Sequence, residues 1–174
     1  MVLSVEHTAY TSGSIKDVWK LWEQVETWPK WDGALQSSSL QKGQKFSLDS
    51  ECVLTVHGNP QPIVVRITEF ASRKNFTTQG RNDLGVVTIY HEVGPSDQGV
   101  SITHKMTFEG NDQKTQQIFE KNVWPHLSGG LAKAVDALAT LSGSLKAKDK
   151  RGNASLGDDG KAEGASRAKA PRKK

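Results

Sequence analysis

Cysteine is nearly absent from the sequence, since Cys52 is the only one among 174 residues. A single thiol excludes an internal disulfide framework and any zinc site built from several cysteines, and it favours a reducing compartment. We expect Cys52 to be a buried thiol.

Long apolar runs are also missing. No stretch approaches the roughly 20 residues that a membrane-spanning helix needs. The chain starts with MVLSVEHT, which lacks the basic segment followed by an apolar run that marks a secretory signal. We therefore predict a soluble, non-secreted protein with a cytoplasmic location.

The common motifs of nucleotide, redox and acyl-transfer chemistry do not occur. The sequence has no glycine-rich phosphate loop, dinucleotide fingerprint, CxxC pair or Gly-x-Ser-x-Gly elbow. It also has no HxH or HExxH pair, although His7 has the strand parity to bring one more imidazole into the interior. We expect no metal and no cofactor, which leaves a pocket protein as the favoured interpretation.

The net charge of +4 is unevenly distributed. Residues 145–174 hold ten Lys or Arg and four Asp or Glu, and they contain no aromatic, Ile or Val residue. Such a segment buries too little apolar area to offset the entropy of ordering. We predict a folded domain over residues 1–144 and a disordered basic tail over 145–174. The tail lacks aromatic rings for base stacking, so we expect at most weak contacts with anionic surfaces, and no nucleic acid on the domain.

Local patterns predict the order of the elements. Residues 2–10 alternate as a half-buried strand, and Ser14 with Asp17 forms a capping-box pair at the start of a helix. Pro29 ends that helix and favours a short separate helical turn. The apolar stripe of the first helix is Ile15, Val18, Trp19, Trp22 and Val25.

Residues 35–109 read as antiparallel strands joined by short turns, and the pattern becomes helical after Gly110. The longest helix carries a stripe from Leu127 to Leu141, while Pro125 and the pair Gly129-Gly130 predict a kinked or separate first segment at 113–124. One face of the predicted sheet consists of Phe46, Leu48, Cys52, Leu54, Val56, Ile63, Val65, Ile67, Val87, Ile89, His91, Val93, Val100, Ile102, His104, Met106 and Phe108.

This order, together with four segments, resembles the SRPBCC (START-like) superfamily, and more narrowly its polyketide cyclase/dehydrase and lipid-transport-like branch, over residues 2–142. The segments are VWKLWEQVETWPKWDGAL (18–35), RITEF (66–70), TIYHEV (88–93) and SITHKMTFEG (101–110). The resemblance implies an α+β helix-grip fold, with two short helices after the first strand and a curved antiparallel sheet around the C-terminal helix. It also implies a cavity for an apolar ligand. No catalytic residue transfers from the family.

Two histidines are the candidate catalytic groups. If residues 94–99 close a hairpin with Val93 opposite Val100, then His91 and His104 become diagonal neighbours on an apolar face. A neutral imidazole pair can move protons in an aldol-type cyclisation or a dehydration. The alternative is a pair of core histidines satisfied by backbone or water.

Three functions follow. The first is a carrier or sensor that binds a small hydrophobic molecule, such as a lipid, polyketide or isoprenoid, between sheet and helix. The second is a cyclase or dehydratase that uses His91 or His104, and the third is a chaperone-like or assembly-type interaction module docking through its tail. The oligomeric state is open. The predicted ligand-binding residues are Trp28, Trp31, Leu54, Ile67, Ile89, His91, Ile102, His104, Met106, Leu127 and Leu131.

Overall fold

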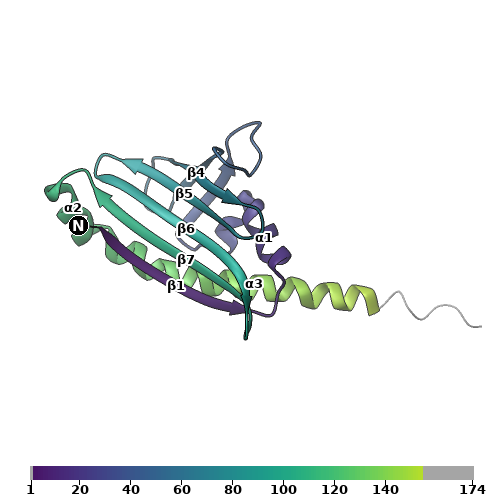
Figure 1. The fold of residues 1–174 in the computed structure, drawn as a ribbon. Coiled ribbons are helices and arrows are strands. Elements are labelled where there is room, and N and C mark those ends of the chain that lie inside the picture. Colours follow the sequence, from purple (N-terminus) through teal and green to yellow (C-terminus); the bar gives the residue numbers. More distant parts are fainter. Residues whose placement is uncertain (1, 155–174) are drawn as a thin grey trace, which may run out of the picture.

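The computed structural model describes the backbone of residues 2–154 and the side chains of residues 2–145 (Figure 1). Seven strands, three α-helices and one short 3-10 helix follow one another along this part of the chain. They are β1 (Leu3–Thr11), α1 (Ile15–Glu23), the 3-10 helix η1 (Val25–Lys30), β2 (Leu35–Leu40), β3 (Glu51–Val56), β4 (Ile63–Ala71), β5 (Asn75–Asn82), β6 (Gly85–Ser96), β7 (Gly99–Gly110), α2 (Gln113–Asn122) and α3 (Trp124–Ala154).

The strands form one antiparallel sheet in the order β1-β7-β6-β5-β4-β3-β2. The first and last strands along the chain are therefore neighbours, and α1 and η1 carry the chain from one edge of the sheet to the other. The long helix α3 runs along β1 and β7 and also packs against α1 and α2 (Figure 1). This arrangement confirms the α+β helix-grip fold.

The first helix begins as its sequence predicts. Ser14 accepts a hydrogen bond from the backbone N–H of Asp17 at 3.2 Å, and the Asp17 carboxylate accepts one from the backbone N–H of Ser14 at 2.8 Å. This capping box satisfies two N–H groups that the first turn leaves without helical partners. It fixes the helix with Trp19 and Trp22 buried against the sheet.

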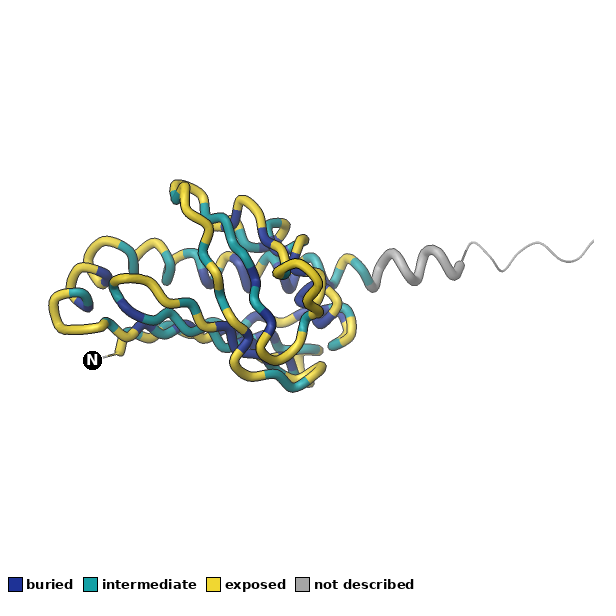
Figure 2. Tube along the Cα trace, turned by 90° about the horizontal axis from the view of Figure 1, so that it is seen from above, coloured by how far each residue is buried: buried dark blue, intermediate teal, exposed yellow. Residues whose placement is uncertain are grey.

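The parity of the strands places the predicted face inward. Figure 2 colours the chain by burial, and from Ile102 to Phe108 on β7 buried residues alternate with half-buried or exposed ones. Two residues of the predicted sheet face do not lie in a strand: Phe46 and Leu48 lie in a loop, because Asp49 has a positive φ of 65° and the extended run starts only at Glu51. Phe46 still packs on the core, whereas the side chain of Leu48 is exposed.

The register of the β6–β7 hairpin differs from the prediction. Ser96 pairs with Gly99 across a two-residue turn, and Val93 pairs with Ile102 instead of Val100. The reason is that β6 continues through Gly94 and the Pro95 position instead of turning there, and the chain reverses at Gly99 with φ +111°. A shift of two residues keeps every side chain on its face, so the buried set is unchanged.

The helical segments after Gly110 separate as expected, with α2 ending at Asn122 and α3 beginning at Trp124. The helix α3 then continues through residues 145–154, ten residues beyond the predicted domain boundary. The rest of the predicted tail, residues 155–174, lies outside the described residues. The tail-dependent interaction hypothesis therefore stays a prediction.

Candidate functional site

The two candidate histidines face each other across neighbouring strands. His91 on β6 pairs directly with His104 on β7, a correction to the diagonal placement, and their ring centroids are 4.4 Å apart at an interplanar angle of 72°. Both side chains are buried, with 5% and 2% of their surface exposed. The structure thus brings together the predicted pair and places it inside the domain.

His91 makes two contacts with Phe76, one through its ring face and one through a ring nitrogen. Its imidazole stacks on Phe76 at a centroid distance of 4.1 Å and an angle of 3°, and its Nδ1 lies 3.3 Å from the Phe76 carbonyl oxygen. A carbonyl can only accept, so this contact places a proton on Nδ1. Burial lowers the pKa of His91 to about 3, and the hydrogen bonds to the Phe76 and Ile89 backbone oppose this shift only in part. His91 is therefore neutral at physiological pH.

His104 is neutral as well but less well satisfied. Burial holds its pKa well below the ordinary value of a histidine, and the nearby His91 and His7 lower it further. Its Nε2 atom is buried and has no hydrogen-bond partner within the described part of the chain. A buried polar atom without a partner is uncommon and points to a group that is missing from the protein's own contacts.

His7 extends this pair into a row of three imidazoles. It pairs with His104 in the β1–β7 ladder. Its side chain is one-third exposed, however, and its Nε2 lies 2.9 Å from Oδ1 of Asp136 on α3. The third imidazole thus links the edge strand to the helix. Across residues 2–154, no three His, Cys, Asp or Glu side chains are grouped as a metal site.

Two tryptophans border His104. The Trp22 and Trp31 rings lie 5.9 and 6.0 Å from the His104 ring, measured between centroids. Their indole Nε1 atoms are also buried without partners among the described residues. Trp28, by contrast, donates to the Trp22 carbonyl at 2.9 Å, and Trp19 donates to Glu23 at 2.7 Å. The sequence predicted Trp31 as a ligand-binding residue but did not indicate that Trp22 would also lie beside His104.

The predicted ligand residues fall into two groups. Three side chains are half-buried: Leu54, Ile89 and Leu127. The others are fully packed, and Trp28, Trp31, Ile67, His91, Ile102, His104, Met106 and Leu131 form this second group. The interior is therefore packed around the histidines and less covered toward β3 and the start of α3.

A half-buried apolar face occupies the less covered part of the sheet. It consists of Leu54, Ile63, Val65, Val87 and Ile89. Leu54 pairs with Ile63, and Val65 and Val87 flank Gly80 in the same row of the sheet. These positions have the parity of the buried interior and do not face solvent on the outer side of the sheet. The main contacts of α3 with the sheet are made by β1 and β7, not by the strands that carry these positions.

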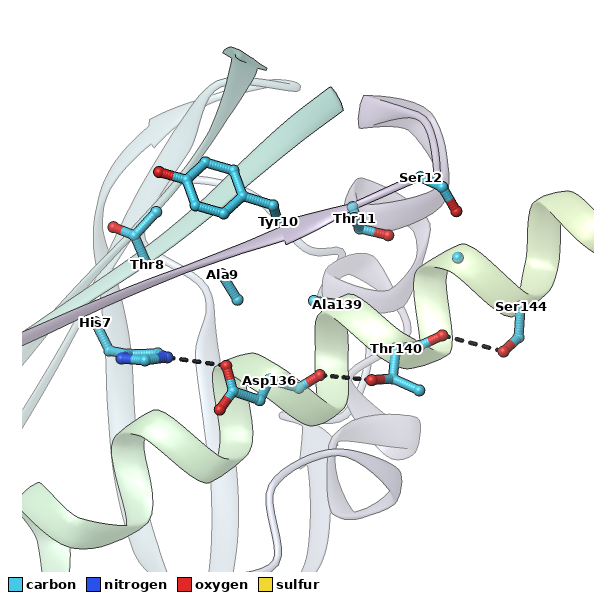
Figure 3. Close-up of a pocket in the computed structure, with 11 residues that line it drawn as sticks. His7, Thr8, Ala9, Tyr10, Thr11, Ser12, Asp136, Ala139, Thr140 and Ser144 are labelled. Atoms are coloured by element: carbon cyan, nitrogen blue, oxygen red, sulfur yellow. Dashed lines mark hydrogen bonds and ion pairs between the residues drawn. The ribbon is translucent and has the colours of Figure 1, made fainter. Parts of the chain in front are cut away.

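Two hollows lie elsewhere on the molecule. One, of about 760 Å³, lies between β1 and the C-terminal half of α3, where Figure 3 shows His7 bonded to Asp136. The other, of about 550 Å³, is formed by the end of β7 and by α2. Neither is lined by a predicted ligand residue. No helix in the described part of the chain has both the length and the hydropathy for a membrane crossing.

The sequence pattern of this chain matches that of a known family. The sequence profile described as "Polyketide cyclase / dehydrase and lipid transport" matches residues 2–143. The chain belongs to this family. Its membership confirms the resemblance to the SRPBCC superfamily and accounts for the order of strands and helices. A comparison with curated proteins finds no match.

Solved structures share the fold at low sequence identity. A norcoclaurine synthase mutant from Thalictrum flavum, in complex with a transition state analogue, is 16% identical, with a TM-score of 0.63 over 85% of this chain and 97% of that one. The di-domain ARO/CYC StfQ of the steffimycin pathway is 10% identical, with a TM-score of 0.65 over 87% and 52%. A Thermobifida fusca protein is 18% identical, with a TM-score of 0.62 over 82% and 95%. These likenesses support the fold.

Proposed function

We propose that this domain binds a small hydrophobic molecule between the half-buried apolar face and the N-terminal half of α3. One observation carries the proposal: on two strands, β6 and β4, the inward positions change from buried to half-buried in the same direction. His91 on β6 is buried and Ile89 and Val87 are not, and the same change runs from Ile67 to Ile63 on β4. An apolar molecule on this face would gain about 25 cal/mol for each Å² removed from water.

The helix supports the same placement. Leu131 is buried, whereas Leu127, one turn earlier, is half-buried. Gly130 lies on the same side of α3 as Leu127 and Ala134, because residues three and four apart share a helix face. A Cβ atom built on Gly130 meets no atom within 4 Å. The inner side of the helix therefore leaves room where the sheet is least covered.

A matched pair of substitutions tests the proposal. Gly130→Leu adds a side chain on the inner face, while Gly129→Leu adds the same side chain at an exposed position that is equally open. We expect the fluorescent probe N-phenyl-1-naphthylamine to bind the unaltered protein and to bind the Gly130 variant about tenfold more weakly or worse. The Gly129 variant should match the unaltered protein.

Native and denaturing mass spectra of gently purified protein provide the second readout. A stoichiometric compound that is released on denaturation would identify the chemical class of the natural ligand. The proposal fails if no compound is retained and the probe does not bind, or if both leucine variants weaken the probe equally.

A second candidate function, cyclase or dehydratase chemistry, is favoured by the neutral His104. When the ring proton of His104 lies on Nδ1, its unbonded Nε2 can accept a proton, as a general base must, although burial lowers its pKa and makes it a weak base. If this function holds, His104→Phe should abolish turnover of a polyketone substrate, and the rate of the unaltered protein should vary with pH. An unchanged rate would exclude His104 as the base.

A further inference from the structure

Three buried nitrogen atoms on neighbouring aromatic rings have no hydrogen-bond partner in residues 2–145. They are Nε1 of Trp22, Nε1 of Trp31 and Nε2 of His104. The Trp22 and Trp31 rings lie within 6.0 Å of the His104 imidazole, measured between centroids. At most 5% of each side chain is exposed. Buried polar groups in folded proteins are nearly always hydrogen-bonded, so three neighbouring exceptions require a common explanation.

The chemistry of the three atoms defines the missing partner. An indole N–H only donates, so the two tryptophans require an acceptor. A neutral imidazole carries one ring proton, and when that of His104 lies on Nδ1 its Nε2 accepts. A hydroxyl group meets all three requirements, because its oxygen accepts two hydrogen bonds and its O–H donates one.

The partner must also be uncharged. Every Lys and Arg among residues 2–145 is exposed, and His91 beside His104 is neutral. A carboxylate at this point would be a buried charge without a counterion, which is costly. This excludes fatty-acid-like head groups at the three nitrogens and favours an alcohol, a phenol or an enol.

We propose that Trp22, Trp31 and His104 bind the neutral hydroxyl group of the hydrophobic ligand, an inference that rests on the proposed function. His104 is two residues from Met106, which pairs with Ile89 on the half-buried apolar face. Two residues along a strand span about 7 Å, less than the length of a two-ring aromatic molecule. The apolar body of the ligand lies on that face while its hydroxyl reaches the three nitrogens.

Matched naphthalenes test the inference on the full chain. 2-Naphthol carries the hydroxyl, 2-methylnaphthalene replaces it with a methyl group of similar size, and 2-naphthoate carries a charge. We expect 2-naphthol to bind about five- to tenfold more tightly than 2-methylnaphthalene, the ratio that one net hydrogen bond provides. 2-Naphthoate should bind most weakly.

The indole N–H resonances report the contact directly. In ¹H–¹⁵N spectra of the unaltered protein, 2-naphthol should shift the Trp22 and Trp31 signals downfield. The Trp19 and Trp28 signals should move little, because their N–H groups already have acceptors. Single Trp→Phe variants assign the signals. 2-Methylnaphthalene should not produce the downfield shift.

A pair of variants separates hydrogen bonding from packing. Trp31→Phe removes an unpartnered donor, and Trp28→Phe removes a paired one from the same aromatic cluster. The preference for 2-naphthol should fall to about twofold or less in the first variant and persist in the second.

The outcomes distinguish this inference from the proposed function. If 2-naphthol and 2-methylnaphthalene bind equally well, or the Trp22 and Trp31 signals do not shift, the hydroxyl site is wrong and ligand binding stands. This is the result expected if a bound water permanently occupies the three nitrogens. If no naphthalene binds, both the inference and the proposed function fail.

Discussion

At the scale of single residues, the buried histidines carry the clearest consequence. Their imidazoles are neutral because the interior excludes water, and their pKa values lie below those of an unfolded chain. The unfolded chain therefore binds protons that the folded chain excludes, which makes folding depend on pH. Well above about pH 6.5 the histidines are neutral in both states, so neither adds a pH dependence to the stability.

Stability should fall as the pH decreases through the window from about 6.5 toward 3. Between pH 7 and 5, His91 should lower the free energy of unfolding by about 2 kcal/mol, and His104 should lower it further. Urea unfolding at several pH values checks this. His91→Phe, which keeps an aromatic ring against Phe76, should reduce the pH dependence, with substitution of the exposed His57 as the control. Equal pH dependence in all three proteins would contradict the prediction.

The single cysteine should be inert in the folded protein. Burial, together with the nearby Glu26 carboxylate, raises the pKa of Cys52 to about 12, and the thiolate is the reactive form. We expect labelling by dithionitrobenzoate to proceed only as fast as the protein opens, and to become rapid in urea. Rapid labelling of the folded protein at pH 8 would show that β3 is more accessible than the structure indicates.

At the scale of elements, the β6–β7 turn depends on close contact as well as on backbone geometry. Gly99 has a φ of +111°, and a Cβ atom there would lie 2.6 Å from the carbonyl oxygen of Thr11. Gly43 has a φ of +83° with no atom near. The turn thus packs closely against the end of β1, and a side chain at Gly99 would push the turn and the end of β1 apart.

The two glycines give a matched comparison of stability. Gly43→Ala should cost about 1 kcal/mol, the strain of a positive φ alone. Gly99→Ala should cost more, about 3 kcal/mol, because the new methyl group also displaces the end of β1. Thermal or urea unfolding measures both. Equal losses would mean that the contact with Thr11 is relieved without cost.

At the scale of the whole molecule, the fold follows from the sequence because hydrophobic periodicity determines which side of each element is buried. The capping box at Ser14, the break at Pro29 and the strand parities all depend on neighbours within a few residues, so they can be read locally. The family resemblance supplies the arrangement that periodicity cannot. Together they predict the helix-grip architecture.

The details of the candidate site could not be predicted in this way. The register that places His91 opposite His104 depends on where β6 stops, and parity is unchanged by a shift of two residues. The unpartnered nitrogens of Trp22 and Trp31 arise from three-dimensional packing of distant segments, since identical indoles in Trp19 and Trp28 find acceptors. The difference between the packed and half-buried parts of the face has the same origin.

The pairing of β1 with β7 has a consequence for synthesis. The hydrogen-bond partners of residues 3–11 are residues 100–108, so a growing chain holds its first strand without its sheet partner while nearly 90 residues are added. At roughly 5–20 residues per second this interval lasts about 5–20 s. During that time Leu3 and Val5 and the backbone of the strand lack their native cover. Chaperone contact on the ribosome should therefore matter most for the N-terminal segment, and the fold should be complete only when both β7 and α3 have been released.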